Sequence, residues 1–486
     1  MKKFYITTSI AYTNAPPHIG FTLELIQADV LARYHRLLGE NVFYLTGTDE
    51  HGRKVAEAAA ENKKSPKKFS DEISTRFKEL TKILNLSNNN FIRTTDKIRH
   101  WPVVKKVWLE LKKNGDIYKK KYKGLYCSGC EAFITKKDLK DGKCILHKKK
   151  PEIIKEENYF FKLSRYSKQI EKAIEKNKIR IVPIVRKNEI LSFIKKGLED
   201  VSFSRPRKDL KWGIPVPEDN TQTIYVWADA LINYLSVLSY PHGNNFKKYW
   251  PVDIHFLGKD ILRFHATIWL GMLLSLRLPL PKNIFVHGFI TSNGQKMSKS
   301  LGNVIDPFEL VKKYGTDPLK YFLLREVPST EDGDFTYQKF EERYNSDLAK
   351  GLGNLVARII TLAKKLKIKK EKLKVKNPKL KKEIDNTWKK YKKALEEFRF
   401  NEALKTIWGL IGFCDKYIEK NKPWSLDPAQ DKEKINKVIA DLLFALNEIV
   451  KLLKPFLPES SEKILKNIRQ LAEKTKKSKP LFPRLT

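Results

Sequence analysis

The chain has 486 residues, which suggests roughly three domains at about 150 residues each, and 41% of them are hydrophobic, which excludes a wholly disordered chain. Lys and Arg number 96 against 56 Asp and Glu, so the formal net charge is +40 at pH 7. This surplus favours a polyanionic partner, with nucleic acid first, and the alternative source of the charge is a lysine-biased genome.

The first residues and the apolar runs give no sign of export or of membrane insertion. Thr7, Thr8, Ser9 and Asn14 interrupt any apolar signal-peptide core. The most apolar run, 268–276, is about half as long as the ~20 residues that span a bilayer. Three of the four cysteines fall within 18 residues, which is typical of metal binding in a reducing cytoplasm. We therefore expect a cytoplasmic protein without membrane attachment.

The N-terminal region predicts a strand, a helix and a second strand. Residues 3–9 form an apolar, β-branched run, and residues 42–45 form another. Between them a helical pattern places Ile26, Val30, Tyr34, Leu37 and Leu38 on one side and stops at Gly39. Such a βαβ unit predicts a parallel sheet with a ligand crevice at its carboxyl edge.

The rest of the chain predicts a second α/β half and then helices. Strands are expected at 223–227, 253–257 and 284–287, and from about residue 335 the chain is helical and lysine-rich, with a linker at Asn377-Pro378. The fold class is therefore α/β, with a parallel sheet split by an insert and followed by an α-helical bundle. The expected parts are the first half of the α/β domain at 1–115, the insert at 116–205, the second half with its connector at 206–334, the helical domain at 335–470 and a tail at 471–486.

The insert carries a predicted metal site. Cys127 and Cys130 have C-x2-C spacing, and Cys144 and His147 have C-x2-H spacing. Together they supply four ligands for a tetrahedral Zn²⁺ ion and leave no open position for water, so we expect one structural zinc. Free surface cysteines are the alternative. Cys414, alone in an apolar helical stretch, is expected to be a core residue.

A phosphate site is predicted where the first helix begins. His18 and Gly20 follow the first strand, where a helix N-terminus presents unpaired N–H groups to phosphate. His18 can donate to a phosphate oxygen, and Gly20 leaves room for a nucleotide against the backbone. A histidine that only caps the helix is the alternative for this short motif.

The segment KMSKS at 296–300 is a second candidate for phosphate binding. It follows the strand signal at 284–286, and Gly294 and Gly302 on either side are expected to leave the loop free to close. Lys296 and Lys299 can neutralise charge that develops on phosphate oxygens, although an isolated lysine pair is more often solvated surface. Its combination with His18 and Gly20 in a split α/β chain favours the functional interpretation.

These two segments resemble the signatures of class I aminoacyl-tRNA synthetases, and further stretches are similar to the methionyl-tRNA synthetase family with a single zinc knuckle. The further stretches are Ala11–Asn14, Thr46–Gly52, Trp212–Pro217, Tyr225–Ala230, Gly258–Ile261 and His265. They cover residues 4 to about 305 in the family's order. The resemblance implies a Rossmann-type sheet split by a zinc-binding insert, with a C-terminal helical domain that binds the anticodon.

The resemblance also implies a reaction, its partners and its site residues. Methionine would attack the α-phosphorus of ATP, which arrives with Mg²⁺, and the methionyl group would then pass to tRNA(Met), initiator and elongator. His18, Lys296 and Lys299 would be catalytic, and Gly20 and Phe21 would join them in binding ATP. The implied methionine-binding residues are Ile10, Tyr12, Asp49, Arg205, Trp227, Ala230, Leu231, Tyr234 and His265. Asp49 would hold the substrate ammonium, and Tyr12 and His265 would offer polar hydrogens near the sulfur.

Two departures from the family pattern stand out. Phe21 occupies the place of a second signature histidine and cannot donate to phosphate, so one transition-state contact is missing or supplied by another residue. No tryptophan follows Trp424, although the family stacks a late tryptophan on an anticodon base, and Asn401, Trp408 and Trp424 receive no base contacts here. The sequence ends at Thr486 without the tRNA-binding module of some relatives, so a monomer is expected.

Two other interpretations remain at this point. A cysteine- or branched-chain-specific synthetase would share both signatures, but the aromatic residues Tyr12, Trp227 and Tyr234 favour methionine. A catalytically impaired relative that acts as an RNA-binding protein is the second, and Phe21 is the residue that favours it.

Overall fold

The computed structural model describes residues 1–129, 132–134, 138–145, 148–297, 301–365, 375–427, 429–472 and 480–485. These residues form two compact units. The first comprises 1–17, 38–82 and 86–287, and the second comprises 18–37, 83–85 and 288–486. The units are defined by internal packing, and the domain boundaries expected from the sequence stay a prediction.

A six-stranded parallel sheet forms the centre of the first unit, in the order β3-β2-β1-β14-β15-β9. Its strands are β1 (Lys3–Tyr12), β2 (Asn41–Asp49), β3 (Asn90–Arg93), β9 (Arg180–Val182), β14 (Ile254–Gly258) and β15 (Asn283–His287). Ile6 of β1 lies opposite Ile254 of β14, so the two halves of the sequence meet in the middle of the sheet. This arrangement confirms the predicted parallel α/β fold.

The central strands are buried along most of their length, which explains their nearly continuous apolar runs. Gly47 in β2 shows how closely the strands approach. A Cβ atom there would lie 2.1 Å from the carbonyl oxygen of Ile92 in β3, so any larger residue would push the two strands apart.

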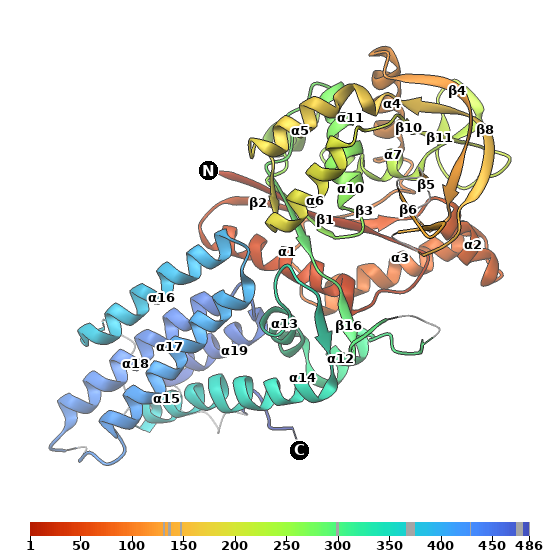
Figure 1. Ribbon diagram of the computed structural model, residues 1–486. Helices are drawn as coiled ribbons and strands as arrows, with labels where there is room; N and C mark the ends of the chain where they lie inside the picture. Colours follow the sequence, from red (N-terminus) through yellow and green to blue (C-terminus); the bar gives the residue numbers. More distant parts are fainter. Residues whose placement is uncertain are drawn as a thin grey trace. The chain divides into compact units, whose positions relative to one another are not determined.

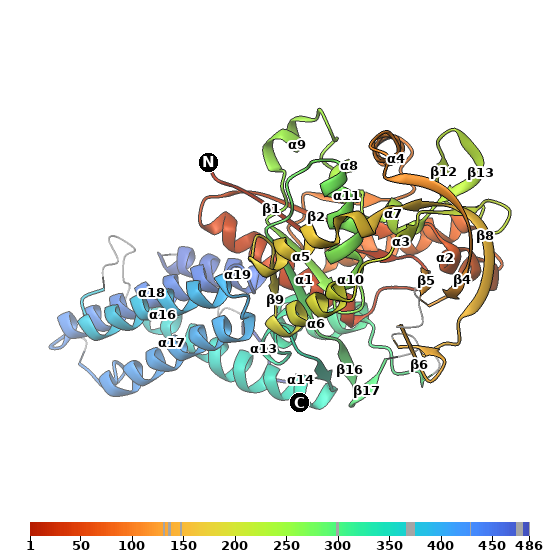
Figure 2. The ribbon, with the colours of Figure 1, turned by 45° about the horizontal axis from the view of Figure 1, so that its top comes forward.

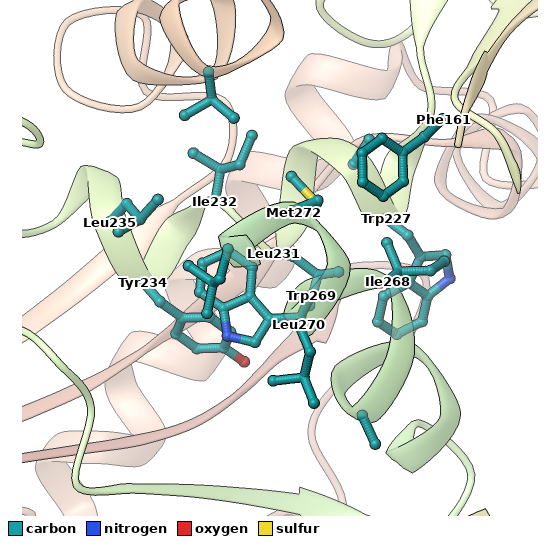
Figure 3. Packing of buried hydrophobic residues seen from close by; sticks show 14 of the residues in the cluster. Phe161, Trp227, Leu231, Ile232, Tyr234, Leu235, Ile268, Trp269, Leu270 and Met272 are labelled. Atoms are coloured by element: carbon teal, nitrogen blue, oxygen red, sulfur yellow. The ribbon is translucent and has the colours of Figure 1, made fainter. Parts of the chain in front are cut away.

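Short helices surround this sheet in the first unit, and Figure 3 shows part of the apolar core that they build with it. They are α2 (Arg53–Glu61), α3 (Pro66–Ile83, whose last residue belongs to the second unit), α4 (Trp101–Lys113), α5 (Ser167–Glu175), α6 (Ile184–Lys195), α7 (Val226–Ala230), α8 (Asn233–Ser236), α9 (Asn244–Tyr249), α10 (Leu262–Phe264) and α11 (Leu270–Ser275). A 3₁₀ turn, η2 (Leu163–Tyr166), and a π-helix, η3 (His265–Trp269), complete the set.

The insert is built on two long antiparallel strands, β4 (Ile117–Cys127) and β8 (Glu152–Phe161), which Figure 2 shows side by side. They belong to a four-stranded sheet in the order β10-β8-β4-β5, with β5 (Ala132–Ile134) and β10 (Val201–Ser202) at its edges. A small hairpin of β6 (Leu139–Lys140) and β7 (Lys143–Cys144) stands apart from it. A three-stranded sheet then pairs β11 (Ser204–Pro206) and β12 (Pro215–Val216) with β13 (Asp219–Ile224).

The strand predicted at 223–227 is wrong in part. β13 ends at Ile224 and runs antiparallel to its neighbours outside the central sheet, and α7 begins at Val226. Residues 224–238 are buried throughout, and a fully buried segment carries no periodicity that distinguishes a strand from a helix.

The second unit contains α1 and everything after residue 287 that the structure describes. Its small sheet, in the order β17-β16-β18, consists of β16 (Ile290–Ser292), β17 (Gln295–Lys296) and β18 (Gly333–Phe335). Its helices are α1 (Ile19–Leu37), α12 (Pro307–Tyr314), α13 (Thr316–Arg325), α14 (Tyr337–Arg343), α15 (Asn354–Lys365), α16 (Pro378–Glu396), α17 (Phe400–Asn421), α18 (Lys432–Leu453) and α19 (Pro458–Arg469), with a π-helix η5 (Tyr344–Gly353) and a 3₁₀ turn η6 (Gln470–Ala472). Figure 1 shows α15 to α19 packed as a bundle, which confirms the helical C-terminal region.

Buried charges tie α1 to α13 within the second unit. The Lys320 ammonium lies 3.0 Å from Asp29 Oδ2, and both side chains are almost fully buried. Arg33 donates to the same carboxylate at 2.8 Å. Because a buried charge is costly without a partner, these ion pairs specify how the helix that begins after His18 packs on α13.

The predicted linker and the described part of the predicted tail both make defined contacts. Asn377 caps α16, because its side-chain oxygen accepts hydrogen bonds from the N–H groups of Lys379 and Leu380. In the described part of the predicted tail, Phe482 is buried beside Tyr344 and the N–H of Leu485 donates to Asn345 Oδ1 at 2.9 Å. Among the helices that the structure describes, none is both long enough and apolar enough to cross a membrane.

Candidate active site

All nine residues expected to bind methionine lie in the first unit, and three of them, Ile10, Tyr12 and Asp49, lie at the carboxyl ends of the central strands β1 and β2. β1 ends with Ile10 and Tyr12, and β2 ends at Asp49, which lies opposite Tyr12 in the sheet register. α7 carries Trp227 and Ala230, and the others follow on nearby segments: Arg205 in β11, Leu231 after α7, Tyr234 in α8 and His265 in η3.

Trp227 is the centre of an aromatic cluster. Its ring stacks on Phe264, with centroids 3.9 Å apart and an interplanar angle of 7°. Tyr12 and His265 meet the same indole edge-on, at centroid distances of 6.3 and 6.2 Å. The sequence analysis missed Phe264, although it lies directly before His265. Its position next to His265 in the sequence was the available indication. A π-helix begins at His265, so the residue spacing of an α-helix does not predict which side chains lie together here.

Hydrogen bonds hold His265 in one neutral form. Its Nδ1 donates to the Ile261 carbonyl at 3.1 Å, so Nε2, 2.8 Å from the Tyr234 hydroxyl, accepts a hydrogen bond from it. Burial lowers the pKa of His265 to about 4, which keeps the ring uncharged at neutral pH. Both ring nitrogens are thus used within the protein, which differs from the expectation that His265 offers a polar hydrogen to the substrate sulfur.

A second buried histidine supports the first. The Trp269 indole N–H donates to His255 Nε2 at 3.2 Å, so His255 Nδ1 donates to Thr7 Oγ1 at 2.7 Å. Burial, together with the nearby His265, lowers the pKa of His255 well below its usual 6.5. Tyr234 lies between these groups, 4.4 Å from the His255 ring and 5.6 Å from the Trp269 ring, and Figure 3 shows the rings of Tyr234 and Trp269 close together. Together with Trp227 and Tyr12, the residues Tyr234, His255, His265 and Trp269 form an uncharged aromatic surface, called the aromatic wall below.

The loop after β2 is fixed on both sides of Asp49. Asp49 is buried, and its carbonyl accepts the N–H of Thr13 at 3.0 Å. The fully buried Glu50 carboxylate receives two hydrogen bonds from Arg93, at 2.7 and 2.8 Å. The Trp212 indole N–H donates to the Glu50 carbonyl at 2.5 Å. Bidentate arginine bonds of this kind impose a defined geometry, so Asp49 sits on a rigid support.

Arg205 lies among residues of the insert. Its Nη1 donates to Ser202 Oγ at 2.8 Å and to the Ser204 carbonyl at 2.6 Å, and its guanidinium lies 4.7 Å from the centroid of the Tyr225 ring. It lines a cavity of about 140 Å³ together with Phe264 and other residues. None of these contacts joins Arg205 to Tyr12 or Asp49, and its place among the methionine-binding residues stays a prediction.

His18 stands at the start of α1 in the second unit. The Gly20 N–H donates to His18 Nδ1 at 3.1 Å, so Nε2 carries the proton of the neutral ring. His18 is exposed to solvent, yet desolvation by the surrounding protein lowers the pKa of its imidazole below 6.5. A Cβ atom on Gly20 would lie 2.9 Å from His18 Cε1, so this glycine gives the imidazole its room.

The first signature lies close to the segment that follows the second one. The Ile19 N–H donates to the Ile305 carbonyl at 3.2 Å, five residues beyond the end of KMSKS. Lys296 is exposed at the end of β17, whereas Lys299 lies outside the described residues. Gly294 is not a free hinge, because Asn293 and Gly294 form a two-residue hairpin turn at positive φ and the Gly294 N–H donates to Asp334 at 2.8 Å.

Two of the four predicted zinc ligands are described. Cys127 ends β4 and Cys144 ends β7, and both side chains are buried in the insert. The Cys144 carbonyl accepts the Lys148 N–H and the Cys144 N–H donates to the Lys149 carbonyl, both at 2.8 Å. Cys130 and His147 lie outside the described residues. The described residues contain no group of three or more metal-binding side chains, and those present fit one half of the predicted site.

Three residues of the helical region that have no assigned base contact differ in their exposure to solvent. Trp408 is partly buried against Tyr321 and donates to the Asp347 carbonyl at 3.2 Å, and Asn401 accepts from Ser329 at 3.5 Å. Trp424, in contrast, is 48% exposed after α17, and the guanidinium of Arg358 lies 5.5 Å from its ring centroid. Trp424 therefore presents a ring face on the surface, whereas Trp408 belongs to the packing.

Comparison with known proteins gives concordant matches. Residues 4–137 and 129–360 match the family model for class I tRNA synthetases of the M type, and residues 377–483 match the anticodon-binding domain of tRNA ligases. The methionine–tRNA ligase of Thermotoga maritima is 42% identical over 480 residues, which cover 96% of this chain and 75% of that protein. The ligase of Brucella suis biovar 1 is 40% identical, with 97% and 93% covered. The structure of Mycobacterium tuberculosis methionyl-tRNA synthetase in complex with methionyl-adenylate superposes with a TM-score of 0.91 at 35% identity and covers 100% of both chains.

Proposed function

The chain belongs to the methionine–tRNA ligases of class I, and on this premise we propose how its own residues perform the reaction. Members activate L-methionine with ATP to methionyl-adenylate and transfer the methionyl group to tRNA(Met), and this chain does the same. The observation that carries the proposal is the aromatic cluster on Trp227, with Tyr12 and His265 around it, beside the buried Asp49. The comparisons give no support to an RNA-binding protein without catalysis.

Methionine binds against the uncharged aromatic wall in this proposal. A thioether packs well against ring edges, and Trp227, Tyr12 and Tyr234 supply them. His265 contributes shape rather than charge, because its pKa of about 4 and its two internal hydrogen bonds keep it neutral. Asp49 pairs with the substrate ammonium, and this ion pair selects an α-amino acid over other thioethers.

ATP binds through the two signatures. His18 donates from Nε2 to a phosphate oxygen, and the Gly20 N–H fixes that tautomer from the other side of the ring. Lys296 and Lys299 neutralise the charge that develops on the leaving diphosphate, and Mg²⁺ accompanies the nucleotide on its own phosphates. No covalent intermediate with the protein is required, so catalysis rests on positioning and charge stabilisation.

Pyrophosphate exchange with each of the twenty amino acids tests this function. Purified protein should exchange label from pyrophosphate into ATP with methionine, and should do so far more weakly with cysteine, valine or isoleucine. Exchange with cysteine or valine alone would reject the methionine assignment. A complete lack of exchange, with tRNA binding retained, would instead support the impaired relative.

We also propose one structural zinc ion in the insert, held by Cys127, Cys130, Cys144 and His147. Zinc would tie the end of β4 to the β6–β7 hairpin and would take no part in the chemistry. The reduced thiolates that it needs are consistent with a cytoplasmic protein. Metal analysis of the purified protein should find about one zinc per chain, and Cys127→Ser should lose it. A full complement of zinc in that variant would place the ion elsewhere.

Trp424 is the proposed stacking platform for a base of the tRNA anticodon. It is exposed in the region that matches the anticodon-binding domain, and the guanidinium of Arg358, which is paired with Asp415 and Glu419, lies near its ring. Stacking of a base on an aromatic ring is worth about 1–3 kcal/mol. Trp424 received no base contact from the sequence alone, because the family stacks a tryptophan that lies later in the chain.

Trp424→Ala should therefore raise the KM for tRNA in aminoacylation by roughly tenfold while leaving tRNA-independent pyrophosphate exchange unchanged. Trp408→Phe is the matched control, because Trp408 packs inside the bundle and should not alter that KM. An unchanged KM for tRNA in Trp424→Ala would remove this residue from the RNA-binding surface.

A further inference from the structure

A buried His–Asp–His cluster lies beside the proposed methionine site. Asp229 is about 1% exposed, and each of its carboxylate oxygens contacts a different histidine. His51 Nδ1 lies 2.6 Å from Oδ2, and His100 Nε2 lies 2.8 Å from Oδ1. The two imidazoles are as deeply buried as the carboxylate, and the rings of Trp101 and Trp212 flank His51 at 5.9 and 5.4 Å.

The cluster joins segments with different tasks. His51 lies two residues after Asp49, and Asp229 lies two residues after Trp227 in α7. The His51–Asp229 bond therefore connects the proposed ammonium-binding residue to the centre of the aromatic cluster. His100, at the start of α4, bonds Ser236 of α8 at 2.7 Å through its other nitrogen, and α4 carries none of the proposed substrate-binding residues.

The chemistry of the cluster makes this connection stiff. Burial alone would raise the pKa of Asp229, but the two histidines hold it below its usual value and keep the carboxylate charged. A buried carboxylate that loses a hydrogen-bond donor has no water to replace it, so it resists displacement from either histidine. In the loop after β2, Glu50 is held by Arg93, which is not part of α7. Among the hydrogen bonds described above, the one from His51 to Asp229 therefore connects this loop to α7.

We propose that His51 and Asp229 are positioning residues that fix the distance between Asp49 and Trp227, and so set the affinity for methionine. The inference rests on the methionine site proposed above. Neither residue needs to touch the substrate. His100 supports the same carboxylate from α4 and serves mainly stability.

The geometry of the two histidines permits a matched test. Asn places its amide nitrogen where Nδ1 of histidine lies, and Gln places it near Nε2. His51→Asn should therefore keep the bond to Asp229, and His51→Gln should lose it. The reverse holds for His100, where Gln keeps the bond and Asn is too short. KM and kcat for methionine and for ATP in pyrophosphate exchange are measured for all four variants, together with the Tm.

We expect His51→Gln to raise the KM for methionine about tenfold and His51→Asn to stay within about twofold of the wild type. The KM for ATP should remain within about twofold in both. His100→Asn should lower the Tm as much as His51→Gln does but leave the KM for methionine within about twofold. If His51→Gln does not fold, Asp229→Asn takes its place, because the two histidines face different side-chain atoms and one of these becomes an amide NH2, which cannot accept a hydrogen bond.

Two results would overturn the inference. One is an unchanged KM for methionine in His51→Gln. The other is a KM for methionine that rises in both His51→Gln and His100→Asn, in proportion to the decrease in Tm of each variant. Failure of the proposed function looks different, because the wild-type protein itself would then show no exchange with methionine.

Discussion

His18→Ala should lower methionine-dependent pyrophosphate exchange by roughly 10²–10³-fold in kcat, the usual cost of losing one transition-state donor. The structure gives the reason, because Gly20 holds Nδ1 and leaves the Nε2 proton for phosphate. The KM for methionine should change little, since His18 is not among the residues proposed to bind methionine. Steady-state exchange with ATP and methionine varied separately measures both effects.

His18→Gln is the control for this prediction, because its amide nitrogen lies near the position of Nε2. It should restore part of the lost rate, whereas His18→Asn should not. Equal rates in the wild type and His18→Ala would show that the imidazole only caps α1.

Asp49→Asn should lower kcat/KM for methionine by roughly 10²-fold or more, which corresponds to about 3 kcal/mol for a buried ion pair that loses one charge. Asp49 is buried and held by its neighbours, so no other conformation is available to compensate. The measurement is exchange at low methionine concentration. Asp219→Asn is the control, since that carboxylate pairs with Lys119 of the insert and should leave kcat/KM unchanged.

A methionine analogue without the amino group sharpens the test of Asp49. The wild-type protein should bind it weakly in competition with methionine, and Asp49→Asn should bind it no more weakly, because the charge pair is already absent. If the substitution weakens the analogue as much as methionine, Asp49 acts through the structure of the site and not through the ammonium.

The parts of the fold that follow a simple period were predictable from the sequence. β1, α1, β2, β14 and β15 lie where the apolar patterns placed them, because buried strands form nearly continuous apolar runs and the apolar positions of α1 recur at helical spacing. The antiparallel β13 and the short α7 were not, since residues 224–238 are buried throughout and show no alternation of buried and exposed positions. In a segment that is buried throughout, neither the segment's length nor its pattern of hydrophobic residues indicates a five-residue helix.

The residues of the candidate site could be proposed from the sequence, but the contacts between them could not. The roles of Phe264, His255 and Trp269 depend on ring stacking and hydrogen bonds between residues from different strands and helices. The tautomer of His265 depends on Ile261, whose carbonyl takes part as backbone and leaves no trace in the side-chain pattern. Gly294 was misread for a related reason, because the sequence shows a glycine but not the hairpin turn that uses it.

The place of β1 in the middle of the sheet has a consequence for biosynthesis. Thr7 is separated from its partner His255 by 248 positions, so a ribosome adding about 5–20 residues per second needs roughly 10–50 s to deliver the second neighbour of β1. During that time β1 and β2 can pair, but the other side of β1 presents an apolar strand edge of the kind that promotes aggregation. Production of the catalytic half therefore depends on protection of this edge in the nascent chain until β14 and β15 have left the ribosome.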